Sequence, residues 1–201
     1  MKILLTGASS GVGQALYQQL RVDYEVTAPT REQLNLRDLT QAMSFVHQSY
    51  DMLINCAGTG IGGKIDFVNH CASDMVDLLH TNFIAPVLLS QSVLGNNPRA
   101  KIVNITSTNN SRYWPNDLAY SLSKKALEDF GKMLVVEYPT VKYLEIRLGL
   151  TKTKFNQNRF RNDPGRYTDI YDRPHLLPSE VADKICKILF DHTIKFIEIS
   201  P

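Results

Sequence analysis

Residues 6–13 read Thr6-Gly7-Ala8-Ser9-Ser10-Gly11-Val12-Gly13 and lie between a short apolar run and a helical pattern. The apolar run is Lys2 to Leu5, and the helical pattern is Val12 to Leu20. Glycines at such a strand-to-helix turn allow backbone N–H groups to approach a dinucleotide pyrophosphate without a Cβ in the way. The spacing is G-x-x-x-G-x-G, not G-x-G-x-x-G, and a turn that holds no ligand is the alternative interpretation. The turn predicts these cofactor-binding residues: Gly7, Ser9, Ser10, Gly11, Val12 and Gly13.

Outward from this turn, short apolar runs alternate with longer helical patterns. Further strands are expected at Glu25 to Ala28, Met52 to Asn55, Lys101 to Ile105, Lys142 to Arg147 and Lys195 to Ile199. Further helices are expected at Leu39 to Gln48, Ala72 to Leu94 with a break, Asp117 to Glu137, and Ser179 to Phe190. This alternation predicts an α/β fold of the Rossmann type, a doubly wound parallel sheet with helices on both faces. Its ligand is expected at the carboxyl ends of the strands.

The chain is shortened between its second and third strands. Only Pro29 to Gln33 separates the second strand from a short strand expected at Leu34 to Leu36, so a full crossover helix does not fit there. The total length of 201 residues allows one sizeable core and leaves little room for a second. We therefore expect residues 1–201 to form a single domain.

Composition excludes several classes of protein. Apolar residues make up 43% of the chain and charged residues 21%, as in ordinary globular proteins. The net charge of +2 and the absence of a long basic run predict no binding to nucleic acid or to a membrane. Cys56, Cys71 and Cys186 form no C-x-x-C pair, which favours reduced thiols and a cytoplasmic protein. No stretch is expected to reach membrane-spanning length, and the histidines show no metal-ligand spacing.

Tyr120-Ser121-Leu122-Ser123-Lys124 is the candidate for catalysis. Residues four apart on a helix share a face, so the Lys124 ammonium is expected beside the Tyr120 phenol. A nearby positive charge favours the phenolate and brings tyrosine toward the range of a useful general acid or base. Any helix can carry this pair as a solvated surface pair, so the interpretation depends on its combination with other residues.

Two further segments support that combination. Ile102 to Ser107 resembles a buried strand whose carboxyl end would deliver the Ser107 hydroxyl to the ligand edge, although a helix-cap serine is the alternative. Asn55-Cys56-Ala57-Gly58 follows another strand, the fourth in the predicted order. Its small residues would let the chain pass beside the adenosine half of a cofactor, or simply form a turn.

Together these residues resemble the classical short-chain dehydrogenase/reductase family. The resemblance is carried by T-G-x-x-x-G-x-G at Thr6 to Gly13, N-x-A-G at Asn55 to Gly58, Asn82, Ser107 and Tyr120-x-x-x-Lys124. It runs to about residue 153 and returns over residues 178–199. It implies an NAD(P)-dependent enzyme in which Tyr120 is the general acid/base and Lys124 lowers its pKa and binds the nicotinamide ribose. It further implies that Ser107 orients the substrate carbonyl and that Asn82 completes a proton relay.

The resemblance also places the rest of the cofactor. It implies that Asn55, Ala57 and Gly58 lie along it, that Asn35 and Leu36 contact the adenine, and that Gly149 and Thr153 reach the nicotinamide carboxamide. Leu148 departs from the family pattern, because it stands where a proline is usual.

The end of the second strand bears on cofactor choice. The chain reads Ala28-Pro29-Thr30-Arg31 there, with a base and no acid. A guanidinium matches a phosphate bidentately, so Arg31 predicts NADP(H) over NAD(H), with an exposed surface arginine as the alternative.

The segment Leu150 to Pro178 is where substrate contacts are expected, because it is long and shows no clean periodicity. Aromatic walls are offered by Arg112-Tyr113-Trp114 and by Phe155, Phe160, Tyr167 and Tyr171, which could equally be packing residues. Between residues 152 and 173, basic residues outnumber acidic ones by six to three. The basic residues are Lys152, Lys154, Arg159, Arg161, Arg166 and Arg173, and the acidic residues are Asp163, Asp169 and Asp172. An anionic substrate is one hypothesis and a solvated loop is the other.

The predicted function is hydride transfer between NADP(H) and a small carbonyl or alcohol. The alternatives are a non-catalytic dinucleotide-binding regulatory protein on the same fold and, less favoured by the glycine spacing, a nucleotide-sugar epimerase or dehydratase. The resemblance implies a homodimer or homotetramer. An apolar row on the helix that carries Tyr120 could serve such an interface or could be buried against the sheet: Leu118, Leu122, Ala126, Phe130 and Leu134.

Overall fold

The computed structural model describes residues 1–61, 67–111, 117–161 and 163–201. Six parallel strands form one sheet in the order β2-β1-β3-β4-β5-β6. The strands are β1 (Lys2–Leu5), β2 (Glu25–Thr27), β3 (Met52–Asn55), β4 (Lys101–Ser107), β5 (Lys142–Leu148) and β6 (Phe196–Ile199). The main helices are α1 (Gly11–Leu20), α2 (Leu39–Ser44), α3 (Ala72–Leu79), α4 (Ala85–Asn96), α5 (Leu118–Glu137) and α8 (Pro178–Ile188). This confirms the predicted doubly wound parallel sheet.

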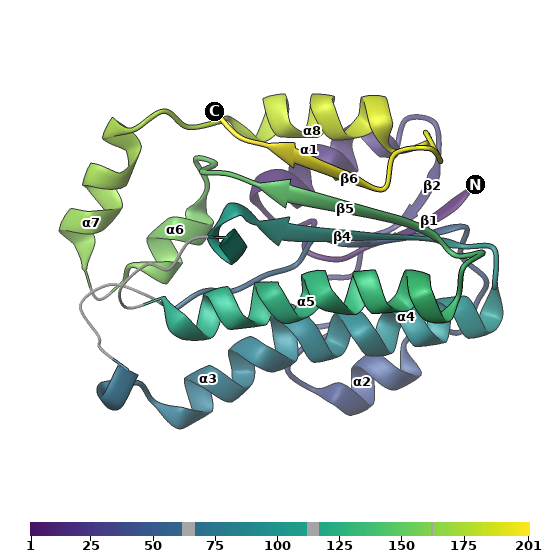
Figure 1. Ribbon diagram of the computed structural model, residues 1–201, viewed down its shortest axis with the longest axis horizontal. Coiled ribbons are helices and arrows are strands. Elements are labelled where there is room, and N and C mark those ends of the chain that lie inside the picture. The colour runs from purple at the N-terminus through teal and green to yellow at the C-terminus, as the bar shows by residue number, and fades with distance from the viewer. Residues whose placement is uncertain (62–66, 112–116, 162) are drawn as a thin grey trace.

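Helices cover both faces of the sheet. Figure 1 shows α1 and α8 on one face and α2, α4 and α5 on the other. Successive side chains of β1 point to opposite faces of the sheet, so this strand contributes to both cores. Ile3 and Leu5 lie in the core on the side of α1 and α8, whereas Leu4 lies in the core on the side of α4. All three side chains are fully buried. The sheet is therefore held rigidly from both sides, and its carboxyl edge is left for the site.

The strand expected at Leu34 to Leu36 is not formed, and that prediction is wrong. Backbone N–H groups there are satisfied locally, since Leu34 N donates to Thr30 O at 2.9 Å and Asn35 N donates to Gln41 Oε1 at 2.9 Å. Leu34 and Leu36 instead bury their side chains in the core beside α2 and α4. The alternating apolar pattern of residues 34–36 therefore reflects the burial of these two leucines, not a strand. In the absence of this strand, β2 forms the edge of the sheet. The strand that ends at Asn55 is consequently the third, not the fourth.

The helix expected at residues 72–94 has no break. A π-helical turn at His80–Ile84 joins α3 to α4, so Ala72–Asn96 is one helical segment of 25 residues. By length and hydropathy alone this segment is long enough to cross a membrane, which contradicts the expectation that no stretch approaches that length. Its residues Leu78, Leu89 and Val93 are fully buried within the protein, so the apolar character of this segment is used in the core.

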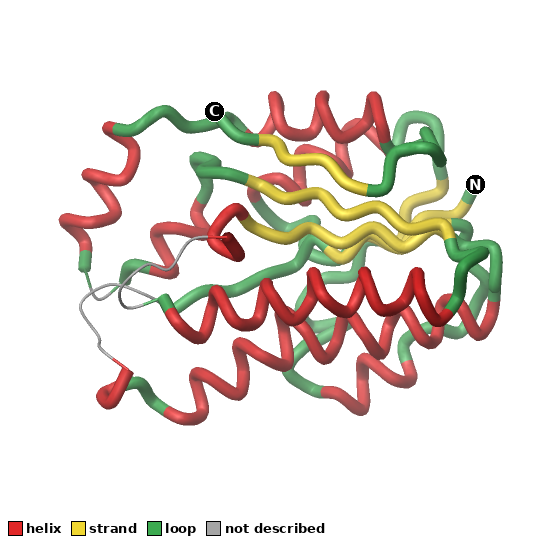
Figure 2. Tube along the Cα trace, viewed as in Figure 1, coloured by secondary structure: helices red, strands yellow, loops and turns green. Residues whose placement is uncertain are grey.

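The segment from Leu150 to Pro178 contains more structure than its sequence indicated. Two short helices, α6 (Lys154–Arg159) and α7 (Pro164–Asp169), are followed by a 3-10 turn at Ile170–Asp172. The Tyr171 hydroxyl accepts a hydrogen bond from Thr153 N at 3.2 Å and another from Asn156 Nδ2 at 3.0 Å. Figures 1 and 2 show α6 and α7 beyond the carboxyl ends of the strands. Tyr171 therefore braces α6 at the edge where the ligand is expected.

Candidate active site

A cavity of about 1350 Å³ lies at the carboxyl edge of the sheet. It extends from the glycine turn to α6, and its volume exceeds the roughly 300–1,000 Å³ of ordinary small-ligand pockets. The predicted residues that line it are Gly7, Ser9, Ser10, Gly11, Val12, Gly13, Arg31, Asn35, Leu36, Ala57, Gly58, Ser107, Tyr120, Lys124, Gly149 and Thr153. Two predicted residues, Asn55 and Asn82, do not line it. The structure thus brings together on one cavity residues that are far apart in the sequence.

The turn after β1 needs glycine at two positions for different reasons. Gly7 has φ +78°, and a Cβ on it would lie 2.7 Å from the backbone N and Cα of Ala57. A Cβ on Gly13 would overlap the carbonyl oxygen of Gly7. The turn is therefore packed backbone against backbone, in a conformation that other residues adopt only with strain.

The N-terminus of α1 suits an anion. Ser10 is its N-cap residue but makes no side-chain capping hydrogen bond, and the first turn contains no acidic residue. Ser10, Gly11 and Val12, at the start of this helix, line the cavity. Free N–H groups and the positive end of a helix dipole are what a pyrophosphate requires. These residues fit a dinucleotide cofactor.

Thr6 ties the glycine turn to the loop after β3. Its Oγ1 accepts hydrogen bonds from Cys56 N at 3.2 Å and Ala57 N at 3.1 Å, and it donates to Ile54 O at 3.4 Å. The side chain is 3% exposed. Threonine is thus required by the close approach of two loops, which explains why the motif starts one residue before Gly7.

Tyr120 and Ser107 lie at the inner end of the cavity. Tyr120 comes from the first turns of α5, Ser107 from the last residue of β4, and both are buried. Burial raises the pKa of Tyr120, whereas the Arg159 guanidinium and a hydrogen bond with Ser107 lower it; the Asp117 carboxylate raises it. A buried phenol next to a hydroxyl can hold a proton for transfer to a substrate oxygen.

Lys124 is buried one helical turn further along α5. Its Nζ donates to Ile105 O at 2.9 Å, and burial lowers its pKa to about 8, while the nearby Cys56 thiol has the opposite effect. Gly58 lies next to this ammonium, since a Cβ on it would be 3.4 Å from Nζ, an ordinary van der Waals distance. The lysine is therefore held in a narrow slot between β4 and the loop after β3.

Neither of the two asparagines lines the cavity, and each is held by hydrogen bonds inside the protein. Asn82 lies in the π-helical turn with no exposed surface; its Nδ2 donates to Thr59 O at 2.8 Å and Ser123 Oγ at 3.0 Å, and its Oδ1 accepts from Thr59 N at 2.8 Å. Asn55 donates from Nδ2 to Asn104 Oδ1 at 2.9 Å. Asn82 thus fixes Thr59, which does line the cavity.

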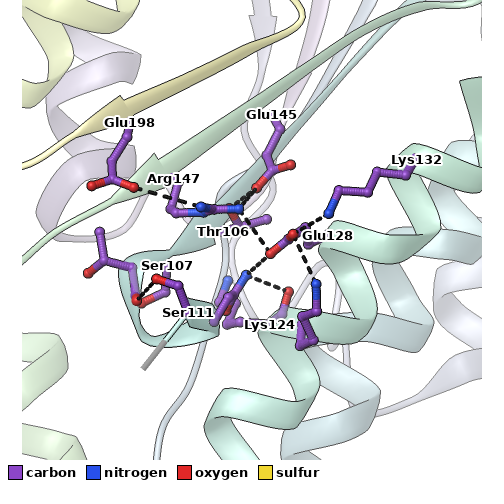
Figure 3. A network of polar contacts seen from close by, with 12 residues as sticks. Thr106, Ser107, Ser111, Lys124, Glu128, Lys132, Glu145, Arg147 and Glu198 are labelled. Atoms are coloured by element: carbon purple, nitrogen blue, oxygen red, sulfur yellow. Dashed lines mark hydrogen bonds and ion pairs between the residues drawn. The ribbon is translucent and has the colours of Figure 1, made fainter. Parts of the chain in front are cut away.

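A network of polar contacts and ion pairs holds the backbone of Lys124 (Figure 3). Asn110 Nδ2 donates to the Lys124 carbonyl at 3.1 Å and to Glu128 Oε2 at 2.9 Å. Burial would raise the pKa of Glu128, but hydrogen bonds from Lys132, Asn110 and Lys125 together lower it to about 2. Arg147 bridges this carboxylate, at 3.1 Å, to that of Glu145, at 3.4 Å. The network anchors the backbone from which Lys124 extends.

Leu148, which stands where the family usually has a proline, lies at the end of β5. It pairs with Ile199 and extends β5 by one residue, after which Gly149 N donates to Ile199 O at 2.8 Å. A proline at this position would have restricted the strand. Gly149 and Thr153 line the cavity.

The aromatic residues proposed as substrate walls divide into two groups. Phe155 and Phe160 line the cavity, whereas Tyr167 packs edge-on against Tyr171, which braces α6. The segment Arg112-Tyr113-Trp114 lies outside the described residues.

The local excess of positive charge does not all face the cavity. Arg159 does, and it forms an ion pair with the buried carboxylate of Asp117; Arg161 is exposed and pairs with Asp74 at 3.3 Å. Sequence reasoning missed Asp117, which is 2% exposed and also accepts hydrogen bonds from Asn109 and Ser121. The only signal was an acid directly before the helix that carries Tyr120.

Known proteins resemble this chain in sequence and in structure. The family model for short chain dehydrogenase matches residues 25–164. A 3-ketodihydrosphingosine reductase of Bacteroides thetaiotaomicron is 32% identical over 181 residues, which cover 78% of this chain and 66% of that protein.

Two solved structures share the fold. A small-chain dehydrogenase in complex with NADPH has a TM-score of 0.86 at 19% identity, with 100% of this chain and 96% of that chain covered. A 4-hydroxyisoleucine dehydrogenase complexed with NADH has a TM-score of 0.81 at 22% identity, with 99% and 96% covered. The fold and the family match define an NAD(P)-dependent oxidoreductase. The chain belongs to the short-chain dehydrogenase family.

Proposed function

We propose that this protein transfers a hydride between NADP(H) and a small carbonyl or alcohol, with Tyr120 as the general acid/base. The observation that carries the proposal is that Tyr120, Ser107, Lys124 and the glycine turn all line one cavity. The cofactor supplies or accepts the hydride when it is bound. The residues of the chain bind, orient and exchange a proton.

Each residue has a role that its position supports. In the reductive direction, Tyr120 donates its proton to the substrate oxygen while Ser107 holds that oxygen by a hydrogen bond. The Lys124 ammonium lines the cavity next to Gly58, where it would hydrogen-bond the nicotinamide ribose. Asn82 keeps the Thr59 backbone in place at the wall of the site.

A substitution at Tyr120 tests the proposal. Tyr120→Phe removes the transferable proton and keeps the ring, so turnover of any substrate found in a panel of carbonyl compounds with NADPH should be nearly abolished. NADPH affinity should remain close to that of the wild type. A Phe variant with normal turnover ends the assignment of Tyr120. NADPH binding without turnover of any compound by the wild-type protein supports a non-catalytic dinucleotide-binding protein instead.

We further propose NADP(H) as the preferred cofactor, bound at its 2′-phosphate by Arg31. Arg31 is exposed at the cavity just after β2, and within the described parts of the chain no ion pair holds it. Arg37, by contrast, is paired with Asp77 at 2.8 Å. Arg31→Ala should weaken NADPH binding more than NADH binding. Equal preference for the two cofactors in the wild type and in the variant would refute this role.

We also propose that the protein is cytoplasmic and assembles as a homodimer or homotetramer through α5. Leu118 and Leu122 are 45% and 57% exposed, although Leu134 of the same row is buried. Leu122→Glu should shift the molar mass measured by light scattering toward the monomer. A monomeric wild-type protein would contradict the assembly.

A further inference from the structure

We propose that Arg159 of α6 is a positioning residue that acts on Tyr120: its guanidinium, stacked on the phenol ring and paired with Asp117, favours the deprotonated phenol when α6 is seated. This proposal rests on the proposed role of Tyr120. It adds a cation from the substrate segment, which lies 39 residues further along the chain.

The first support is the stacking geometry. The Arg159 Cζ lies 4.5 Å from the centroid of the Tyr120 ring, within the range of a cation–π contact. Phe155, one turn earlier on α6, packs against the same ring with centroids 5.5 Å apart. Two residues of α6, spaced four apart, therefore cover the phenol together.

The second support is the fixed position of the guanidinium. The Arg159 side chain is 10% exposed and forms an ion pair with Asp117, which is 2% exposed and precedes α5. A Cβ on Gly60 would lie 3.0 Å from both Arg159 Cδ and Phe155 Cζ, so the loop after β3 closes over the arginine stem. A buried arginine that is paired and enclosed in this way keeps its charge close to the phenol instead of in solvent.

The third support is the set of charges around the phenol. In the described part of the chain, Tyr120 shares a hydrophobic cluster with apolar side chains of α3 and of the loop after β3, namely Leu78, Met75 and Ile61. Ser107 at the end of β4 is neutral. Burial raises the pKa of Tyr120, Arg159 lowers it and Asp117 raises it.

The Lys124 ammonium has a hydrogen-bond partner other than the phenol. Its Nζ donates to Ile105 O at 2.9 Å and lies beside the thiol of Cys56. Arg159 is thus the cation stacked on the ring, and Asp117 is the acid that offsets part of its effect.

The experiment is a titration that needs no substrate. Protein labelled with ¹³Cζ-tyrosine is titrated by NMR, and the Tyr120 signal is assigned by its loss in Tyr120→Phe. Arg159→Met removes the charge and keeps much of the stem, so the Tyr120 midpoint should rise by about one pH unit. Asp117→Asn should move the midpoint the other way. Arg159→Lys restores a charge and should titrate closer to the wild type than Arg159→Met does.

Arg161→Met is the matched control, because Arg161 lies in the same segment, 61% exposed, and pairs with Asp74 away from the ring. Its Tyr120 midpoint should equal that of the wild type. If the wild-type midpoint exceeds the pH range in which the fold persists, the comparison is made between Asp117→Asn and Asp117→Asn/Arg159→Met, because Asp117→Asn lowers the midpoint of each protein relative to the counterpart that keeps Asp117.

An unchanged midpoint in Arg159→Met, or a shift that Arg161→Met reproduces, overturns the proposal. So does a fall of the midpoint in Arg159→Met. A protein with these shifts but no oxidoreductase activity would refute the proposed function and leave the effect of Arg159 on Tyr120 standing. Circular dichroism of every variant shows that the fold is kept, and Arg159→Lys and Asp117→Asn supply the comparison if Arg159→Met does not fold.

Discussion

Replacement of Gly7 by alanine tests whether the glycine turn depends on backbone packing. Two costs follow from the structure. The φ of +78° places alanine in the left-handed region, which costs about 1–2 kcal/mol. The new Cβ would lie 2.7 Å from the backbone of Ala57, and such overpacking costs about 1–3 kcal/mol. Gly7→Ala should therefore lower the free energy of unfolding by about 2–5 kcal/mol.

Urea unfolding followed by circular dichroism measures this loss. With an m-value of about 2 kcal/mol/M, the midpoint should fall by about 1–2.5 M. The affinity for NADPH, measured by fluorescence titration, should fall too, since Ala57 must move and it lines the cavity.

Gly95→Ala is the control for the same chemical change. Gly95 lies in α4. Among the described residues, and apart from its chain neighbours and the backbone of its own helix, no atom lies within 4 Å of the place that a Cβ would take. Alanine there should therefore be neutral or stabilise the protein by up to about 1 kcal/mol. If Gly7→Ala unfolds at the wild-type urea concentration and binds NADPH equally well, the packing argument is wrong.

Two further changes probe the supports of the site. The pKa of Glu128 is lowered in the fold from its usual 4.5 to about 2, so its contribution to stability is present above about pH 4.5 and is lost as the pH falls through about 2. Glu128→Gln should therefore cost about 2 kcal/mol at neutral pH and little near pH 2, and a cost that does not vary with pH would contradict this account. Tyr171→Phe removes the hydroxyl that accepts from Thr153 N and Asn156 Nδ2, so it should destabilise α6 by about 1–3 kcal/mol and raise KM more than it lowers kcat, as steady-state kinetics would show. An unchanged KM would mean that α6 is held by other contacts.

The sequence predicted the sheet well because local signals agreed with the tertiary structure. Met52 to Asn55 is short, buried at every position and apolar up to Ile54, as is typical of a central parallel strand. Leu34 and Leu36 were misassigned because an alternating apolar pattern can also arise when a turn buries two side chains. The hydrogen bonds that settle the matter run to Thr30 and to the side chain of Gln41, and no local pattern signals the second of these.

The site was predictable to the extent that it follows from strand ends and helix turns. Ser107 ends a strand, and Tyr120 and Lys124 share a helix face, so their convergence on one cavity needed no long-range information. The pair formed by Arg159 and Asp117 was not predictable, because 42 residues separate the two and the irregular composition between residues 150 and 178 concealed α6. An ion pair between residues so far apart in the sequence is revealed only by the three-dimensional structure.

A crystal structure of the protein with NADPH bound tests the central claim most directly. The account predicts the pyrophosphate at the N-terminus of α1 and the nicotinamide beside the Tyr120 hydroxyl and Ser107. A nucleotide bound elsewhere, or a nicotinamide turned away from Tyr120, would contradict it.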